Sequence, residues 1–215
     1  MKKAIVIGGS RGIGRSIASS LRSINCQVIQ TSRNDIDTSD LQSVKKFVAQ
    51  QKYTDIIVLN TGGPPAKSFF DITEHEWNLY HNQLFLSFCL ILQKLKINDG
   101  GYIFLISSDV MKEPNPDLVL SSSYRLAFTS VLKILSKEYA SRNINCINIA
   151  PGAIDTDRVH QLGIDTKKMT SSLPMRRMGK PEEIGNFVAA IIEKEIKYLS
   201  GVVINFDGAN SNYVL

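Results

Sequence analysis

Short apolar runs alternate with longer amphipathic stretches along the chain. Six runs have the length of strands, at residues 4–7, 27–31, 56–59, 102–106, 145–149 and 202–205. Between them, apolar residues recur at helical spacing over residues 13–24, 41–51, 74–95, 121–142 and 181–193. Alternating strands and helices are typical of a parallel sheet. The pattern predicts an α/β fold, a doubly wound parallel sheet of about seven strands with helices on both faces.

One connection in this pattern is too short for a regular crossover. Only residues 34–36 separate the run at 27–31 from the polar stretch Asp37-Thr38-Ser39-Asp40. A crossover between parallel strands takes about a dozen residues and usually contains a helix. We expect the third strand to be vestigial, or to be reached without its helix.

The composition is that of a globular protein. The 215 residues suit a single domain, 43% hydrophobic and 21% charged. The longest apolar stretch, residues 84–92, is far shorter than the roughly 20 residues of a membrane-spanning helix. Glycines begin at Gly8, before the apolar region of a signal peptide is complete. We therefore expect a cytoplasmic protein with no membrane partner.

The charged residues and the cysteines exclude other classes of site. The net charge is +5, but the positive residues are spread along the chain, so we expect no nucleic-acid partner. Cys26, Cys89 and Cys146 are dispersed, which predicts neither a disulfide framework nor a metal site. We expect them to be reduced and buried as small hydrophobic residues.

A glycine-rich turn follows the first apolar run directly. Gly8, Gly12 and Gly14 belong to the segment Gly-Gly-Ser-Arg-Gly-Ile-Gly, between a predicted strand and a predicted helix. Glycines there permit a tight turn and a close approach of the backbone to a pyrophosphate, whose charge the helix N-terminus receives. This order of strand, turn and helix predicts a dinucleotide-binding domain of the Rossmann type.

The residues after the second run indicate which dinucleotide binds. A NAD-dependent enzyme would place a carboxylate here to accept hydrogen bonds from the ribose hydroxyls. The chain has Ser32 and Arg33 instead. Arg33 together with Arg11 predicts a pocket for a 2′-phosphate, because a guanidinium matches phosphate geometry. We therefore expect NADP (NADPH) rather than NAD, with two exposed surface arginines as the alternative.

These features resemble the short-chain dehydrogenase/reductase family over nearly the whole chain. Asp37 matches the family's acidic contact to the adenine ring, and Asn60-Thr61-Gly62 resembles its motif after the fourth strand. Pro151-Gly152, with Ile154 and Thr156, matches its motif after the sixth. With the two arginines, the resemblance implies one NADP-binding domain over residues 1–215 whose cofactor-binding residues are Gly8, Ser10, Arg11, Gly12, Ile13, Gly14, Ser32, Arg33, Asp37, Thr38, Asn60, Thr61, Gly62, Ser107, Arg125, Pro151, Gly152, Ile154 and Thr156.

The catalytic pattern of that family is altered here. Its members usually use a serine, a tyrosine, a lysine four positions later and an asparagine. Ser108 matches the serine. Counts forward from Ser108 and backward from Lys137-Glu138-Tyr139-Ala140 both place Ser121 at the tyrosine position and Arg125 at the lysine position. An ungapped count puts Leu84 at the asparagine position, with Asn82 and Gln83 beside it.

The altered residues leave the proton donor open. Arg125 could still hold ribose hydroxyls and supply positive charge, whereas the Ser121 hydroxyl is a poor acid. Tyr124 shares a helix face with Ser121 and could donate a proton if the helix is displaced, or it could pack at a helix surface or subunit interface. His160 is the one histidine expected near a substrate, and its alternative is a surface position.

The rest of the chain indicates a substrate site and an assembly. Residues 157–180 could form a small lid over a small-molecule substrate, or equally a pair of helices that caps the core. The helices over 74–95 and 121–142 resemble the family's dimer interface, which predicts a homodimer or homotetramer. The apolar residues behind this expectation are Phe85, Phe88, Leu92, Leu126, Val131 and Leu135.

The leading hypothesis is an NADP-dependent oxidoreductase that interconverts a carbonyl and an alcohol. Its catalytic residues would come from Ser108, Ser121, Tyr124 and Arg125. The first alternative is a catalytically silent NADP-binding or scaffold protein, because the tyrosine and lysine are replaced. The second is a non-redox enzyme that reuses the same pocket.

Overall fold

A six-stranded parallel sheet lies at the centre of the computed structural model, which describes residues 1–157, 159 and 165–213. The strand order is β2-β1-β3-β4-β5-β6. All six apolar runs that predict strands are confirmed, as is the doubly wound α/β fold. The strands are β1 (Lys3–Val6), β2 (Gln27–Gln30), β3 (Thr54–Leu59), β4 (Ile97–Ile106), β5 (Asn145–Pro151) and β6 (Val202–Phe206).

The sheet has six strands where the sequence suggests about seven, and the difference lies after β2. The backbone N–H and the hydroxyl of Ser32 both donate to Asp35, at 2.7 Å each, and close a tight turn. The chain then enters α2 (Leu41–Gln50), where Asp40 caps the first turn by accepting from Gln42. No further strand forms among these described residues, because the segment is too short for a crossover. β2 is therefore the edge of the sheet.

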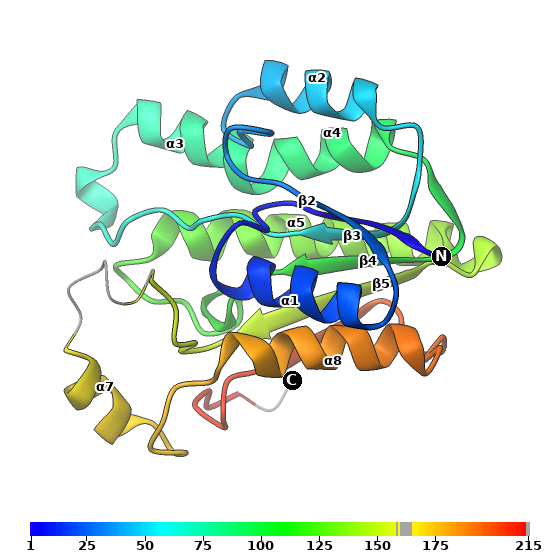
Figure 1. The fold of residues 1–215 in the computed structure, drawn as a ribbon. Coiled ribbons are helices and arrows are strands. Elements are labelled where there is room, and N and C mark those ends of the chain that lie inside the picture. Colours follow the sequence, from blue (N-terminus) through cyan, green and yellow to red (C-terminus); the bar gives the residue numbers. More distant parts are fainter. Residues whose placement is uncertain (158, 160–164, 214–215) are drawn as a thin grey trace.

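Helices cover both faces of the sheet, and each face has its own hydrophobic core. α2, α4 (Ser87–Lys94) and α5 (Val119–Glu138) pack on one face, and α1 (Gly12–Ser23) and α8 (Pro181–Glu193) on the other (Figure 1). Successive side chains of a strand point to opposite faces. Accordingly Ile5 and Ile57 belong to the first core, and Val6 and Ile56 to the second. Burial on both faces explains why the strands appear as unbroken apolar runs.

The predicted helix over residues 74–95 is continuous but contains one wider turn. It comprises α3 (Glu74–His81), the π-helical turn η2 (Asn82–Leu86) and α4. Thr73 and Glu76 form a reciprocal capping box that fixes its start. The predicted helix over 121–142 appears as α5 followed by the 3-10 turn η4 (Ala140–Arg142). The remaining short elements are η1 (Phe69–Asp71), η3 (Asp109–Met111) and α7 (Thr166–Ser172).

The predicted lid over residues 157–180 falls partly outside the described residues, as does His160. Its described part contains α7, which stands away from the sheet in Figure 1 and begins at its N-cap Asp165. The lid therefore stays a prediction. Among the described helices, none combines the length and the apolar character needed to cross a membrane.

Most of the apolar side chains behind the expected oligomer pack in or against the core of the same chain. Phe88 and Leu92 are buried in the core, and Phe85, Val131 and Leu135 pack against it. Leu126 is different, because it is 52% exposed on the outer side of α5 together with Ile134. The homo-oligomer stays a prediction.

The three cysteines are free thiols, as expected from their dispersed positions. Cys26 and Cys146 are buried and Cys89 is half-buried. Burial raises the pKa of each thiol, in the case of Cys146 to about 12. They are therefore protonated at neutral pH and act as core residues.

Candidate active site

A cleft of about 770 Å³ opens where the loops after strands β1 to β5 meet. Ligands of doubly wound sheets bind at this edge, and the volume is typical of ligand sites. The structure brings together nearly all the residues that the sequence predicts for a cofactor site. Those that line the cleft are Gly8, Ser10, Arg11, Gly12, Ile13, Ser32, Arg33, Asp37, Thr38, Asn60, Thr61, Gly62, Ser107, Arg125, Pro151, Gly152, Ile154 and Thr156.

The glycine turn after β1 is so tight that no side chain fits at Gly8 or Gly14. Gly8 has a φ of +60°, and a Cβ there would lie 2.6 Å from the carbonyl oxygen of Asn60. A Cβ at Gly14 would lie 2.2 Å from the carbonyl oxygen of Gly8. Asn60 closes the turn by donating from Nδ2 to that same oxygen at 3.0 Å. Gly14 thus supports the turn from behind without lining the cleft.

The N-terminus of α1 faces the cleft as an uncapped helix end. Its N-cap residue Arg11 makes no side-chain capping hydrogen bond, and the first turn contains no acidic residue. Gly12, with a φ of +51°, and Ile13 both line the cleft. Backbone N–H groups and the helix dipole at such an end attract an anion. The turn and the helix end therefore fit the diphosphate of a dinucleotide.

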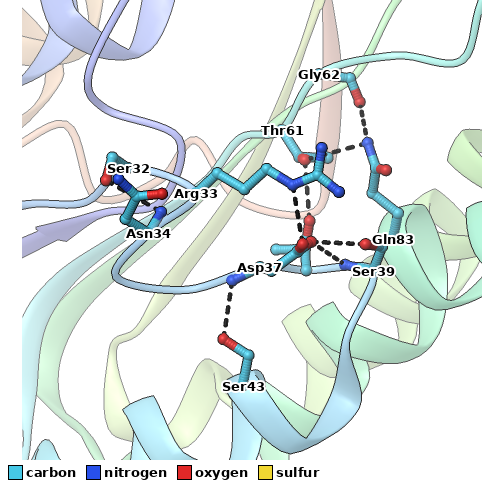
Figure 2. A network of polar contacts seen from close by, with 10 residues as sticks. Ser32, Arg33, Asn34, Asp37, Ser39, Ser43, Thr61, Gly62 and Gln83 are labelled. Carbon is cyan, nitrogen blue, oxygen red and sulfur yellow. Dashed lines mark hydrogen bonds and ion pairs between the residues drawn. The ribbon is translucent and has the colours of Figure 1, made fainter.

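An ion pair organises the loop after β2 (Figure 2). Nε of Arg33 donates to Oδ2 of Asp37 at 2.8 Å, while Oδ1 of Asp37 accepts from the backbone and the hydroxyl of Ser39. Burial opposes the ionisation of Asp37, but these hydrogen bonds outweigh it and lower its pKa. The Arg33 side chain remains 77% exposed at the rim. Its outer N–H groups are positioned to meet an anionic group.

Three of the predicted catalytic residues line the other end of the cleft: Ser108, Ser121 and Arg125. Arg125 is only 8% exposed. Its Nε donates to the Ser121 hydroxyl at 3.1 Å, and its Nη1 donates to the carbonyl oxygen of Ile106 at 2.9 Å. Burial lowers the pKa of Arg125 to about 10, so the guanidinium stays charged at neutral pH. The positions assigned by counting thus lie together in the site.

Tyr124 does not join this group. Its hydroxyl donates to the carbonyl oxygen of Trp77 at 3.1 Å, and its ring packs edge-on against Trp77 and His81. It is absent from the cleft lining. Tyr124 thus packs against α3 within the chain, and its role as a proton donor stays a prediction that requires the helix to move.

The polar residue from the third helix is Gln83 rather than the residue at the counted position. Leu84 is 1% exposed in the core, whereas Gln83 lines the cleft. Nε2 of Gln83 donates to the carbonyl oxygen of Gly62 at 2.6 Å (Figure 2). Both residues lie in the π-helical turn, a feature that often occurs at functional sites. The only sequence signal was a polar residue beside the apolar Leu84.

Two further residues behind the cleft escaped the sequence analysis. Asp109 accepts a hydrogen bond from the Ser108 hydroxyl at 3.0 Å, and an acidic residue directly after Ser108 was the available signal. Asn148 accepts from the Ser107 hydroxyl at 2.6 Å in a buried contact between β5 and the end of β4. The Ser107 hydroxyl is thereby directed away from the cleft, while Ser108 faces it.

The fold, the glycine turn and the polar end of the cleft define a dinucleotide-binding protein of the Rossmann type. A family model described as enoyl-(acyl carrier protein) reductase matches residues 36–209. The 3-oxoacyl-[acyl-carrier-protein] reductase FabG of Chlamydia trachomatis is 28% identical over 241 residues, covering 96% of each chain. The chain belongs to the short-chain dehydrogenase/reductase family of oxidoreductase enzymes.

Two further similarities extend over the same length. The NADPH-dependent reductase BacG of Bacillus subtilis is 26% identical over 254 residues, covering 97% of each chain. The crystal structure of the angucycline C-6 ketoreductase LanV with bound NADP has a TM-score of 0.89 at 20% identity, covering 97% of this chain and 95% of that one. The predicted family and fold are therefore confirmed.

Proposed function

We propose that this protein is an NADP-dependent oxidoreductase that interconverts a carbonyl and an alcohol on a small molecule. One observation carries the proposal: a single cleft joins the glycine turn and two arginines at one end to Ser108 and Arg125 at the other. A cofactor that lies along this cleft would have its phosphates near the turn and its reactive ring near Ser108.

The two arginines support the choice of NADP over NAD. Arg11, in the loop after β1, and Arg33, in the loop after β2, both line the cleft. Asp37, the carboxylate in the same loop that lines the cleft, is already paired with Arg33 and Ser39. A 2′-phosphate would meet guanidinium groups rather than a free carboxylate, which favours the phosphorylated nucleotide. The names of BacG and LanV, which mention NADPH and NADP, agree with this choice.

The chain's own residues would bind and polarise the substrate. Bound NADPH supplies a hydride from its nicotinamide ring. Ser108 presents a hydroxyl that can contact the substrate oxygen, and the charged Arg125 stabilises negative charge that develops in the partly buried site. Gln83 holds the loop at Gly62 in place. Ser121 is smaller than the tyrosine that the family usually has at this position, so it leaves space that the phenol would fill.

Consumption of NADPH in the presence of a carbonyl panel tests the proposal. The panel should include aliphatic ketones, aromatic ketones and 3-oxoacyl thioesters, the last because of the names of the relatives. We expect a loss of NADPH absorbance with at least one class and formation of the matching alcohol. Binding of NADPH without turnover of any member contradicts the proposal.

A catalytically silent NADP-binding protein is the second candidate. Two observations favour it: Ser121 and Arg125 stand at the catalytic positions, and Tyr124 contacts Trp77 and does not line the cleft. The double variant Ser121→Tyr with Arg125→Lys discriminates the two functions. Activity that appears only in the double variant supports the silent protein, whereas turnover by the unaltered chain removes it.

A further inference from the structure

Ser108 and Asp109 form a hydrogen-bonded pair at the catalytic end of the cleft. The Ser108 hydroxyl lies 3.0 Å from Oδ1 of Asp109, and the same oxygen accepts from the backbone N–H of Val110 at 2.9 Å. An ionised carboxylate can only accept hydrogen bonds. The hydroxyl proton of Ser108 therefore points at Asp109 whenever Asp109 is charged. In that state Ser108 offers lone pairs to the cleft and cannot polarise a carbonyl.

The surroundings of Asp109 oppose the ionisation of its carboxyl group. Asp207, in the loop after β6, lies against the same stretch of backbone: a Cβ at Gly152 would be 2.8 Å from Cβ of Asp207 and 3.4 Å from Oδ2 of Asp109. No described Lys or Arg forms an ion pair with Asp109. Burial, and less strongly the charge of Asp207, raise the pKa of Asp109 despite the hydrogen bonds from Ser108 and Val110.

The other charged and titratable groups near this pair are already engaged or also hinder ionisation. Glu113 accepts two hydrogen bonds from Asn212. The ammonium of Lys112 lies 4.8 Å from the centre of the Tyr213 ring rather than at Asp109. Burial and, among smaller causes, the charges of Asp207 and Asp109 raise the pKa of Tyr213. None of these groups forms an ion pair with Asp109, and Arg125 at the same end of the cleft donates to Ser121 and to the carbonyl oxygen of Ile106 instead.

We propose that Asp109 is a positioning residue that sets the direction of the Ser108 hydroxyl proton. When protonated, it donates to Ser108, and Ser108 donates into the cleft. The inference rests on the proposed carbonyl chemistry. As the substrate carbonyl carbon gains the hydride that bound NADPH would supply, the carbonyl oxygen takes the proton of Ser108. Ser108 takes the proton of Asp109, which becomes a carboxylate and is reprotonated by solvent. The relay replaces the phenol that position 121 lacks.

Carbon-13 NMR titration of the Asp109 carboxyl tests the pair in the cofactor-free protein. The signal is assigned by its loss in Asp109→Asn. We expect a midpoint above the ordinary aspartate value of about 4. Ser108→Ala should raise the midpoint further because a hydrogen bond to the carboxylate is lost, and Asp207→Asn should lower the midpoint.

Asp99→Asn, at the opposite end of β4, is the matched control, and the midpoint of Asp109 should not change in it. A midpoint at or below the ordinary value, or one that Ser108→Ala leaves unmoved, overturns the inference.

The pH profile of carbonyl reduction then separates a relay from a purely structural role. The rate should fall about tenfold per pH unit above the Asp109 midpoint, because the proton source is lost. Asp109→Asn should abolish this fall in rate above the midpoint. It should also lower the rate at acidic pH, without changing the NADPH affinity measured by calorimetry. If the rate of the Asp109→Asn variant falls with pH in the same way, the relay is contradicted. If the unaltered protein reduces no carbonyl, the proposed function fails, while the titration still decides the pairing of Ser108 with Asp109.

Discussion

Arg33 and Asp37 form an ion pair that would hold the proposed phosphate-binding arginine in place before a ligand binds. The contact uses Nε of Arg33, so the two terminal nitrogens of the guanidinium stay at the rim of the cleft. An exposed pair of this kind adds little to stability. We expect the pair to restrict the Arg33 side chain and so to reduce the entropy cost of the proposed phosphate binding.

Replacement of Arg33 should therefore affect one cofactor and spare the other. A hydrogen bond between charged groups is worth about 1.5–3 kcal/mol, so Arg33→Ala should weaken NADPH binding by about tenfold to a hundredfold. NADH, which lacks the 2′-phosphate, should bind with unchanged affinity. Calorimetric titration measures both constants.

Arg15→Ala is the matched control, because Arg15 is exposed on the first helix and does not line the cleft. Equal losses in the Arg33 and Arg15 variants would show that only overall charge matters. Equal losses for NADPH and NADH in Arg33→Ala would exclude a contact to the 2′-phosphate.

Single residues differ in how far the sequence could place them. Ser121 and Arg125 lie on one uninterrupted helix, so counting from fixed landmarks put both in the cleft. Gln83 could not be placed by counting, because the π-helical turn changes the register of its helix. The direction of the Tyr124 hydroxyl depends on Trp77, which comes from a different helix, and local spacing does not encode that contact.

At the scale of elements, the close packing of α1 against α8 depends on one glycine. A Cβ at Gly185 would lie 2.7 Å from the hydroxyls of Ser16 and Ser20, and 2.8 Å from the backbone oxygen of Ser16. The two hydroxyls could rotate away, but the backbone oxygen could not without a shift of α1. Because α1 carries the helix end that faces the proposed diphosphate site, we expect its position to matter for binding as well as for stability.

Gly185→Ala should consequently destabilise the protein despite the higher helix propensity of alanine. Propensity alone would favour the variant by about 1 kcal/mol, whereas overpacking costs about 1–3 kcal/mol. The free energy of unfolding in urea measures the balance, and we expect a net loss.

Ala190→Gly, on the exposed side of the same helix, is the control for propensity, and should cost about 1 kcal/mol with no change at the interface. A Gly185→Ala variant more stable than the natural chain would show that the interface relaxes, and would contradict this account of the packing.

The elements themselves were largely encoded in the apolar pattern. Strands buried on both faces leave unbroken runs, and the helices keep their periodicity, so both could be located. The short connection after β2 indicated only that the next strand would be vestigial or reached without its helix, and the structure shows no strand there among the described residues. The internal π-helical turn could not be predicted, since its residues continue the helical pattern without a break.

At the scale of the whole molecule, the parallel sheet places the functional loops at one edge. Five strands end at the cleft, and residues from the start, middle and last third of the chain line it together. The order of strands and helices was sufficient to predict this convergence. The contacts at the altered catalytic end could not be predicted from the sequence. The pairing of Ser108 with Asp109 and of Ser121 with Arg125 depends on side-chain directions.

Calorimetric titration of the unaltered protein with NADPH and with NADH tests the central claim most directly. The glycine turn and the helix end should bind the diphosphate of both, and the arginines should favour the phosphorylated nucleotide by about tenfold or more. We therefore expect measurable binding of NADPH that is clearly tighter than that of NADH. No heat of binding with either nucleotide would contradict the account, and the assignment of the cleft would fall with it.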